Sequence, residues 1–128
     1  MKKPETIIVE KIIATFKRLP GSKTIKLHGN PFMESGSPDL IGAWRGKAFA
    51  IEVKQPGEKP EPIQAHRLSE WAAAGALTGC AHNVAEALSI IGAFAYIPSD
   101  ATGTKNNAAA RDERLRRRSA SAKRQGRA

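Results

Sequence analysis

The fold of this chain is decided by residues 36–54, GSPDLIGAWRGKAFAIEVK, which predict a β-hairpin. Two apolar runs, 39–44 and 47–54, flank the turn residues Arg45-Gly46, and this pattern is typical of paired antiparallel strands. The turn also sets the register, because residues at equal distances from its centre face each other. The numbers of facing residues should therefore add up to 91.

Two acidic residues, Asp39 and Glu52, face each other in this expected hairpin. The Cβ atoms of directly opposed residues lie about 4.5–5.5 Å apart, and like charges at that spacing repel each other. A purely structural sheet should avoid such a pair, whereas a divalent cation between the carboxylates turns the repulsion into a binding site. Hard oxygen ligands suit Mg²⁺ or Mn²⁺. The pair therefore predicts a metal site.

Lys54 follows Glu52 by two residues, so strand alternation places both side chains on the same face. An ammonium group beside two carboxylates and a metal can orient an attacking water or stabilise the charge that develops on a phosphate. Ile51 and Val53 should point the other way, into the core. Glu and Lys two residues apart are also common on solvated strand faces, so the alternative that these acids merely face water stays open.

The rest of the sequence predicts a small α/β domain with the element order α-β-β-β-α-β-α. Apolar spacing, turn residues and a capping pattern at Asn83 and Glu86 mark the elements. A loop rich in Gly, Pro, Ser and Asn precedes the hairpin, and long loops are often functional. We expect helices at 5–18, 61–74 and 84–91, strands at 23–27 and 77–82, the long loop at 28–38, and a last apolar segment at 94–97.

Positive charge is concentrated near the end of the chain. The 128 residues carry a net charge of +9, and residues 99–128 hold nine Lys and Arg against three Asp and Glu, a net charge of +6. Large apolar residues nearly vanish there. The composition therefore predicts a folded domain over 1–98 and a disordered basic tail over 99–128. Such a tail favours a polyanion partner, so a basic nucleic-acid-binding module without catalysis is an alternative function.

Cysteine content and hydropathy point to a soluble protein of a reducing compartment. Cys80 is the single cysteine and has no internal disulfide partner. No stretch approaches the roughly 18 apolar residues of a membrane span, and the first residues do not resemble a signal peptide. We therefore expect a cytoplasmic protein without a membrane partner.

Several of these residues together resemble the virus-type replication-repair nuclease (VRR-NUC) domain of the PD-(D/E)xK superfamily. The family pattern is a helix with a Glu, then Gly-x-Pro-Asp, Glu-x-Lys, a Pro/Gly loop, and a Gln that opens a helix. The matching segments are Gly36-Ser37-Pro38-Asp39, Ile51-Glu52-Val53-Lys54 and Gln64, and the resemblance spans roughly residues 5–92. It implies a restriction-endonuclease-like mixed β-sheet flanked by helices.

The resemblance implies a role for each residue of the hairpin site. Asp39 and Glu52 match the two metal-binding carboxylates, and Lys54 matches the catalytic lysine. The backbone carbonyl of Val53 should also face the metal.

Two helices are implied to complete the site. Gln64 matches the family's Gln, which holds water, substrate or other site residues. Glu10 resembles the helical acid and would be both a catalytic residue and a metal ligand, with Glu5 as a rival for that role.

The implied activity is Mg²⁺- or Mn²⁺-dependent hydrolysis of phosphodiester bonds in DNA. Stand-alone members of the family occur in phages and bacteria, and some act as homodimers on branched DNA such as four-way (Holliday) junctions. A homodimer also has a physical rationale, because one small site cuts one strand and a two-fold pair can cut two.

Overall fold

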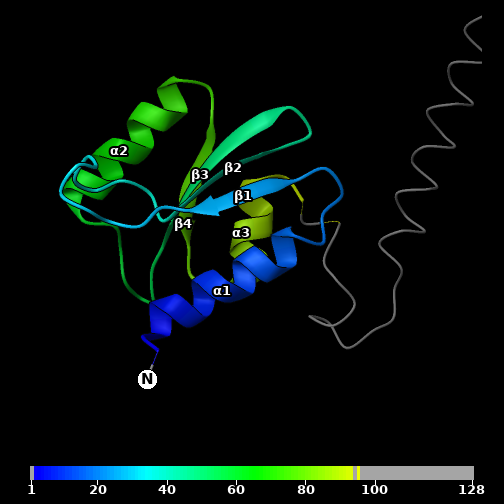
Figure 1. The fold of residues 1–128 in the computed structure, drawn as a ribbon, viewed down its shortest axis with the longest axis horizontal. Helices are drawn as coiled ribbons and strands as arrows, with labels where there is room; N and C mark the ends of the chain where they lie inside the picture. The colour runs from blue at the N-terminus through cyan, green and yellow to red at the C-terminus, as the bar shows by residue number, and fades with distance from the viewer. Residues whose placement is uncertain (1, 94, 96–128) are drawn as a thin grey trace, which may run out of the picture. The chain divides into compact units, whose positions relative to one another are not determined.

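The computed structural model describes residues 2–93 and 95, which form three helices and a four-stranded mixed sheet. The element order is α-β-β-β-α-β-α, so the predicted fold class is confirmed (Figure 1). Each predicted helix and strand is present within two residues of its expected ends. The elements are α1 (Pro4–Phe16), β1 (Lys23–Lys26), β2 (Leu40–Trp44), β3 (Lys47–Val53), α2 (Pro62–Ala73), β4 (Leu77–Ala81) and α3 (Val84–Ile90).

The hairpin of β2 and β3 has the predicted register. Trp44 pairs with Lys47 beside the turn, and the numbers of facing residues add up to 91 along the whole pair. Arg45 and Gly46 both have positive φ, 53° and 78°, as a type I′ hairpin turn requires. This conformation is costly for a residue with a Cβ. The guanidinium of Arg45 lies 4.5 Å from the centroid of the Trp44 ring, and this cation–π contact offsets part of the cost.

The strand order in the sheet is β1-β2-β3-β4. The first three strands are antiparallel neighbours, whereas β4 lies parallel to β3 and is reached through α2. β3 therefore has a neighbour on each side, and its residues from 49 to 53 are all buried. A strand in that position is normally apolar throughout, which makes the acidic Glu52 an exception that needs a reason.

Helices α1 and α3 lie on one face of the sheet and α2 lies on the other (Figure 1). Phe16 of α1 packs edge-on against Phe49 of β3, with ring centroids 5.5 Å apart. A Cβ at Gly79 of β4 would lie 2.7 Å from Cδ1 of Ile90, so glycine is needed for α3 to pack this closely. Because Phe49 faces α1, alternation directs Glu52 toward the α2 face.

The two faces differ in how completely they are covered. The apolar core lies between the sheet and the pair α1 and α3, and it includes Val9, Ile12, Phe16, Leu40, Phe49, Ile51, Val53 and Leu88. This confirms that Ile51 and Val53 point into the core. By contrast, no residue of α2 is buried. The α2 face of the sheet is therefore the face that is covered less completely.

The predicted tail, 99–128, lies wholly outside the described residues, as does the apolar segment 94–97 except for residue 95, so the domain boundary at residue 98 stays a prediction. Within the described residues, no helix combines the length and apolar composition that crossing a bilayer requires.

Candidate active site

Asp39 and Glu52 come together where the hairpin joins the rest of the sheet. Asp39 lies one residue before β2, rather than in the strand as predicted, because its backbone and side chain bond to different segments. Its carbonyl accepts a hydrogen bond from the Leu27 amide at 2.9 Å, and its carboxylate oxygen Oδ2 accepts one from the Val53 amide at 2.8 Å. The second bond fixes the Asp39 carboxylate against β3, beside Glu52.

Glu52 is a buried acid with an unsatisfied oxygen. Its exposed fraction is 2%, and Oε2 has no hydrogen-bond partner within the described part of the chain. Burial, and after it the neighbouring Asp39, raise the pKa of Glu52 from 4.5 to about 8, whereas the charge of Lys54 opposes the shift. An unpartnered buried polar group costs roughly 1–3 kcal/mol. Glu52 therefore lowers the stability of the fold as long as nothing binds its free oxygen.

These two carboxylates fit a divalent cation. An ion between them would satisfy Oε2 of Glu52 and offset the repulsion from Asp39. Across residues 2–93 and 95, no three His, Cys, Asp or Glu side chains gather closely enough to hold a metal. The protein would supply two carboxylates and the expected backbone carbonyl of Val53 as ligands of the cation. Mg²⁺ commonly keeps several waters and binds through one or two carboxylates plus substrate phosphates, which matches this donor set.

Lys54 lies one residue beyond the end of β3, whereas the predicted strand included it. Its amide donates to the carbonyl of Ala81 at 3.1 Å, so the backbone is held at the end of β4. The half-buried side chain lies near enough for its charge to lower the pKa of Glu52. Lys54 and the two acids therefore meet at one end of the hairpin.

Of the two acids on α1, the structure brings Glu5 toward this cluster. Glu5 is half-buried in the first helical turn, and its charge contributes to the raised pKa of Glu52. Glu10 is exposed, and its carboxylate lies 3.0 Å from the ammonium of Lys2. The charge of Glu5 thus acts on Glu52, whereas Glu10 pairs with Lys2, and the helical acid of the site stays a prediction.

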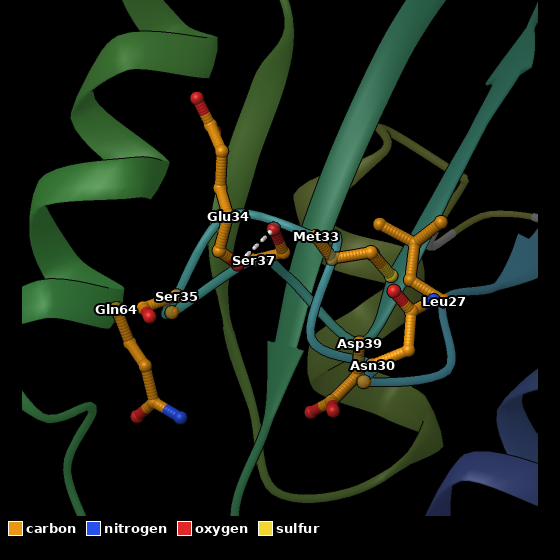
Figure 2. Close-up of a pocket in the computed structure, with 10 residues that line it drawn as sticks. Leu27, Asn30, Met33, Glu34, Ser35, Ser37, Asp39 and Gln64 are labelled. Carbon is orange, nitrogen blue, oxygen red and sulfur yellow. Dashed lines mark hydrogen bonds between the residues drawn. The ribbon is translucent and has the colours of Figure 1, made fainter.

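A cleft of about 270 Å³ opens beside Asp39. Its walls come from the loop between β1 and β2 (residues 27–39, the β1–β2 loop) and from Gln64 near the start of α2. Figure 2 shows the side chains of Asp39 and Gln64 extending in the same direction from separate walls. Oε1 of Gln64 accepts a hydrogen bond from the Glu61 amide at 2.8 Å, so this side chain also caps α2. Glu52 is not part of the lining.

The β1–β2 loop is fixed to α2 at two points. Gly36 has a φ of +79°, and a Cβ there would lie 2.9 Å from the backbone carbon of Ile63, so only glycine allows this approach. Nε of Arg67 donates to the carbonyl of Ser35 at 3.0 Å. Arg67 was not predicted from the sequence. Its one signal is the spacing of three residues after Gln64, which places both on one side of the helix.

His82 ties the loop after Lys54 to α3. Its Nε2 lies 2.8 Å from the carbonyl of Glu58, and its Nδ1 lies 2.9 Å from Oε1 of Glu86. Both partners are acceptors, so only the doubly protonated imidazolium can donate to each of them. The bond to the Glu58 carbonyl, followed by the bond to Glu86, raises the pKa of His82.

Replacing His82 with alanine is expected to remove a pH-dependent part of the stability. Because the folded pKa is raised, this contribution is complete below the ordinary value of 6.5 and is lost as pH rises through the folded value. In urea unfolding, the wild type should exceed the variant by about 0.5–1 kcal/mol at pH 5.5 and by less at pH 9. Glu86→Gln should reduce the stability that His82 contributes at pH 5.5. A difference that is equal at both pH values would contradict the assignment.

Comparisons with known proteins agree with this fold. The sequence matches no family model and no curated protein. A solved structure described as "VRR_NUC domain" aligns with a TM-score of 0.59 and 25% identity, over 71% of this chain and 97% of that chain. This structural likeness supports the assignment of the described part of this chain as a VRR-NUC domain. A second structure, "VRR_NUC domain protein", aligns with a TM-score of 0.59 and 22% identity, over 69% of this chain and 84% of that chain.

The VRR-NUC assignment places the domain in a nuclease family and confirms the restriction-endonuclease-like fold. The residues that carried the resemblance lie around one end of the hairpin, in the cleft or next to it.

Proposed function

We propose that this VRR-NUC domain is a Mg²⁺- or Mn²⁺-dependent endonuclease that hydrolyses phosphodiester bonds in DNA. The observation that carries the proposal is the buried, unpartnered oxygen of Glu52 beside the fixed carboxylate of Asp39. When bound, the cation would polarise the phosphate and make water a stronger nucleophile.

The protein's own groups would position and stabilise the reacting atoms. The Val53 amide holds the Asp39 carboxylate in place by its 2.8 Å hydrogen bond. Lys54 supplies a positive charge that can stabilise the phosphate oxygens as negative charge develops on them. Gln64, held by the Glu61 amide, presents its amide group in the cleft to a water or a phosphate.

We also propose the partners and the setting. The net charge of +9 supports a polyanionic substrate such as DNA. Branched DNA, including four-way junctions, and a homodimer follow from the need for two cuts when one small site cuts one strand. The single Cys80 suits the reducing cytoplasm of a bacterium, with the gene belonging to the host or to a phage.

The direct test incubates the full chain with plasmid DNA and with a four-way junction, in Mg²⁺, in Mn²⁺ and in EDTA. We expect cutting of DNA with either metal and none in EDTA. The test is repeated with a chain truncated at Ser99. If no condition yields cutting and truncation abolishes all DNA binding, the protein is a basic binding module and the nuclease proposal fails.

Glu5→Gln and Glu10→Gln form a matched pair, because both remove one charge from the same helix. Glu5→Gln is expected to slow DNA cleavage by about 10- to 100-fold, since its charge acts on Glu52, at the proposed metal site. Glu10→Gln should stay within about twofold of the wild type, because this acid is engaged with Lys2. Initial rates of plasmid cleavage measure both. The reverse order of effects would assign the helical acid to Glu10.

A further inference from the structure

Phe32 is the most exposed large apolar side chain in the described residues. Its exposed fraction is 98%, whereas Ile7, Ile25 and Ile63, the other exposed members of this class there, are 39–43% exposed. A phenylalanine in water forgoes the stabilisation that burial gives. The fold gains nothing from this ring where it stands, which directs attention to a binding role.

The backbone beneath the ring is braced. The Phe32 amide donates to Oδ1 of Asn30 at 2.9 Å, and the Met33 amide donates to the Asn30 carbonyl at 3.1 Å. Farther along, the hydroxyl of Ser37 donates to the carbonyl of Glu34 at 2.9 Å, as Figure 2 shows. Such side-chain turns restrict the loop. The protein therefore presents the ring from a defined position.

The ring stands next to the proposed active site. Asn30 and Met33, on either side of Phe32 in the chain, line the cleft beside Asp39 (Figure 2). Gly36 packs closely against α2, and Arg67 of α2 donates a hydrogen bond to the loop. These two contacts fix the position of this wall. Phe32 is not part of the lining, so its ring lies outside the cleft, in the chain segment that forms the cleft wall.

We propose that Phe32 stacks on an unpaired base of the DNA substrate and so selects DNA with bases outside a continuous duplex. The inference rests on the proposed nuclease function and adds a specificity-determining residue to it. One aromatic ring is enough for stacking, and any base can stack because every base has a π-face. A protein interface needs a contiguous apolar core. The cleft beside this ring instead carries polar side chains, including Glu34, Ser35 and Ser37.

The test measures binding to two DNA duplexes of the same sequence, one fully paired and one with a single unpaired base at its centre. Fluorescence anisotropy in EDTA reports affinity while no cutting occurs. We expect the wild type to prefer the second DNA. Phe32→Ala should weaken its binding by about 10- to 100-fold and should change binding to the paired duplex by less than threefold. Phe32→Trp should retain the preference, and so should Ile7→Ala, which also removes an exposed apolar side chain.

Three results would overturn the proposal. The first is a wild type that shows no preference, and the second is a Phe32→Ala protein that keeps the wild-type ratio of affinities. The third is a Phe32→Ala protein that loses affinity for both DNAs equally while its mass by light scattering falls from two chains to one, since the ring would then belong to a subunit interface. A parallel incubation with Mg²⁺ separates the two claims, because absent cutting with an intact binding preference overturns only the nuclease proposal.

Discussion

Replacing Asp39 with asparagine is expected to slow DNA cleavage by about 1,000-fold or more, because the cation then loses one of two carboxylates. Asparagine has the same shape and keeps an oxygen that can accept the hydrogen bond from the Val53 amide, 2.8 Å long in the wild type. The hairpin should therefore remain folded while its negative charge is lost. Initial rates of plasmid nicking in saturating Mg²⁺ measure the effect.

The control for this variant is Glu58→Gln, which removes one negative charge from an exposed acid outside the site. Its cleavage rate should match that of the wild type, and the thermal melting of both variants by circular dichroism should confirm that they fold. If Asp39→Asn cuts DNA at the wild-type rate, Asp39 is not a metal ligand and the proposed site is wrong.

Replacing Glu52 with glutamine is expected to stabilise the metal-free protein and to abolish cleavage. The pKa of Glu52 is raised from 4.5 to about 8 by burial and by Asp39. Between these values the unfolded chain has released a proton that the folded chain retains, so stability falls as pH rises through this window. Glutamine does not titrate, so the variant does not lose stability in this pH window. At pH 7.5 we expect a gain of about 1–3 kcal/mol in the free energy of unfolding, which corresponds to several degrees in Tm.

Mn²⁺ should make the wild type more stable than Glu52→Gln, the reverse of the order expected without metal. A cation that binds only the folded state stabilises it by mass action, so the Tm of the wild type should rise with Mn²⁺ concentration. The Tm of Glu52→Gln should not respond, because one ligand is missing. A glutamine variant that is less stable than the metal-free wild type, or that gains as much from Mn²⁺, would show that the buried acid has a purely structural role.

Local rules predicted much of the architecture. The hairpin register follows from the position of Arg45-Gly46 alone, and Asn83 caps α3 as its spacing from Glu86 suggests, with a 2.8 Å bond from the Glu86 amide. These features depend on residues close together in sequence. That Asp39 lies near Glu52 follows from the same register, so it too could be predicted.

Features that depend on tertiary packing could not be predicted. Whether Glu5 or Glu10 faces the hairpin depends on how α1 is rotated against the sheet, and apolar spacing leaves that rotation open. The bonds of Arg67 to Ser35 and of His82 to Glu58 join residues 32 and 24 positions apart. No local pattern specifies such partners. The catalytic and metal-binding roles of the site residues stay predictions.

The most direct measurement is the anomalous scattering of Mn²⁺ in a crystal of the full chain soaked with this ion. The account predicts a peak between the carboxylates of Asp39 and Glu52, where the oxygen of Glu52 has no partner in the described structure. An occupied Mn²⁺ site elsewhere with no peak between these two acids would contradict it.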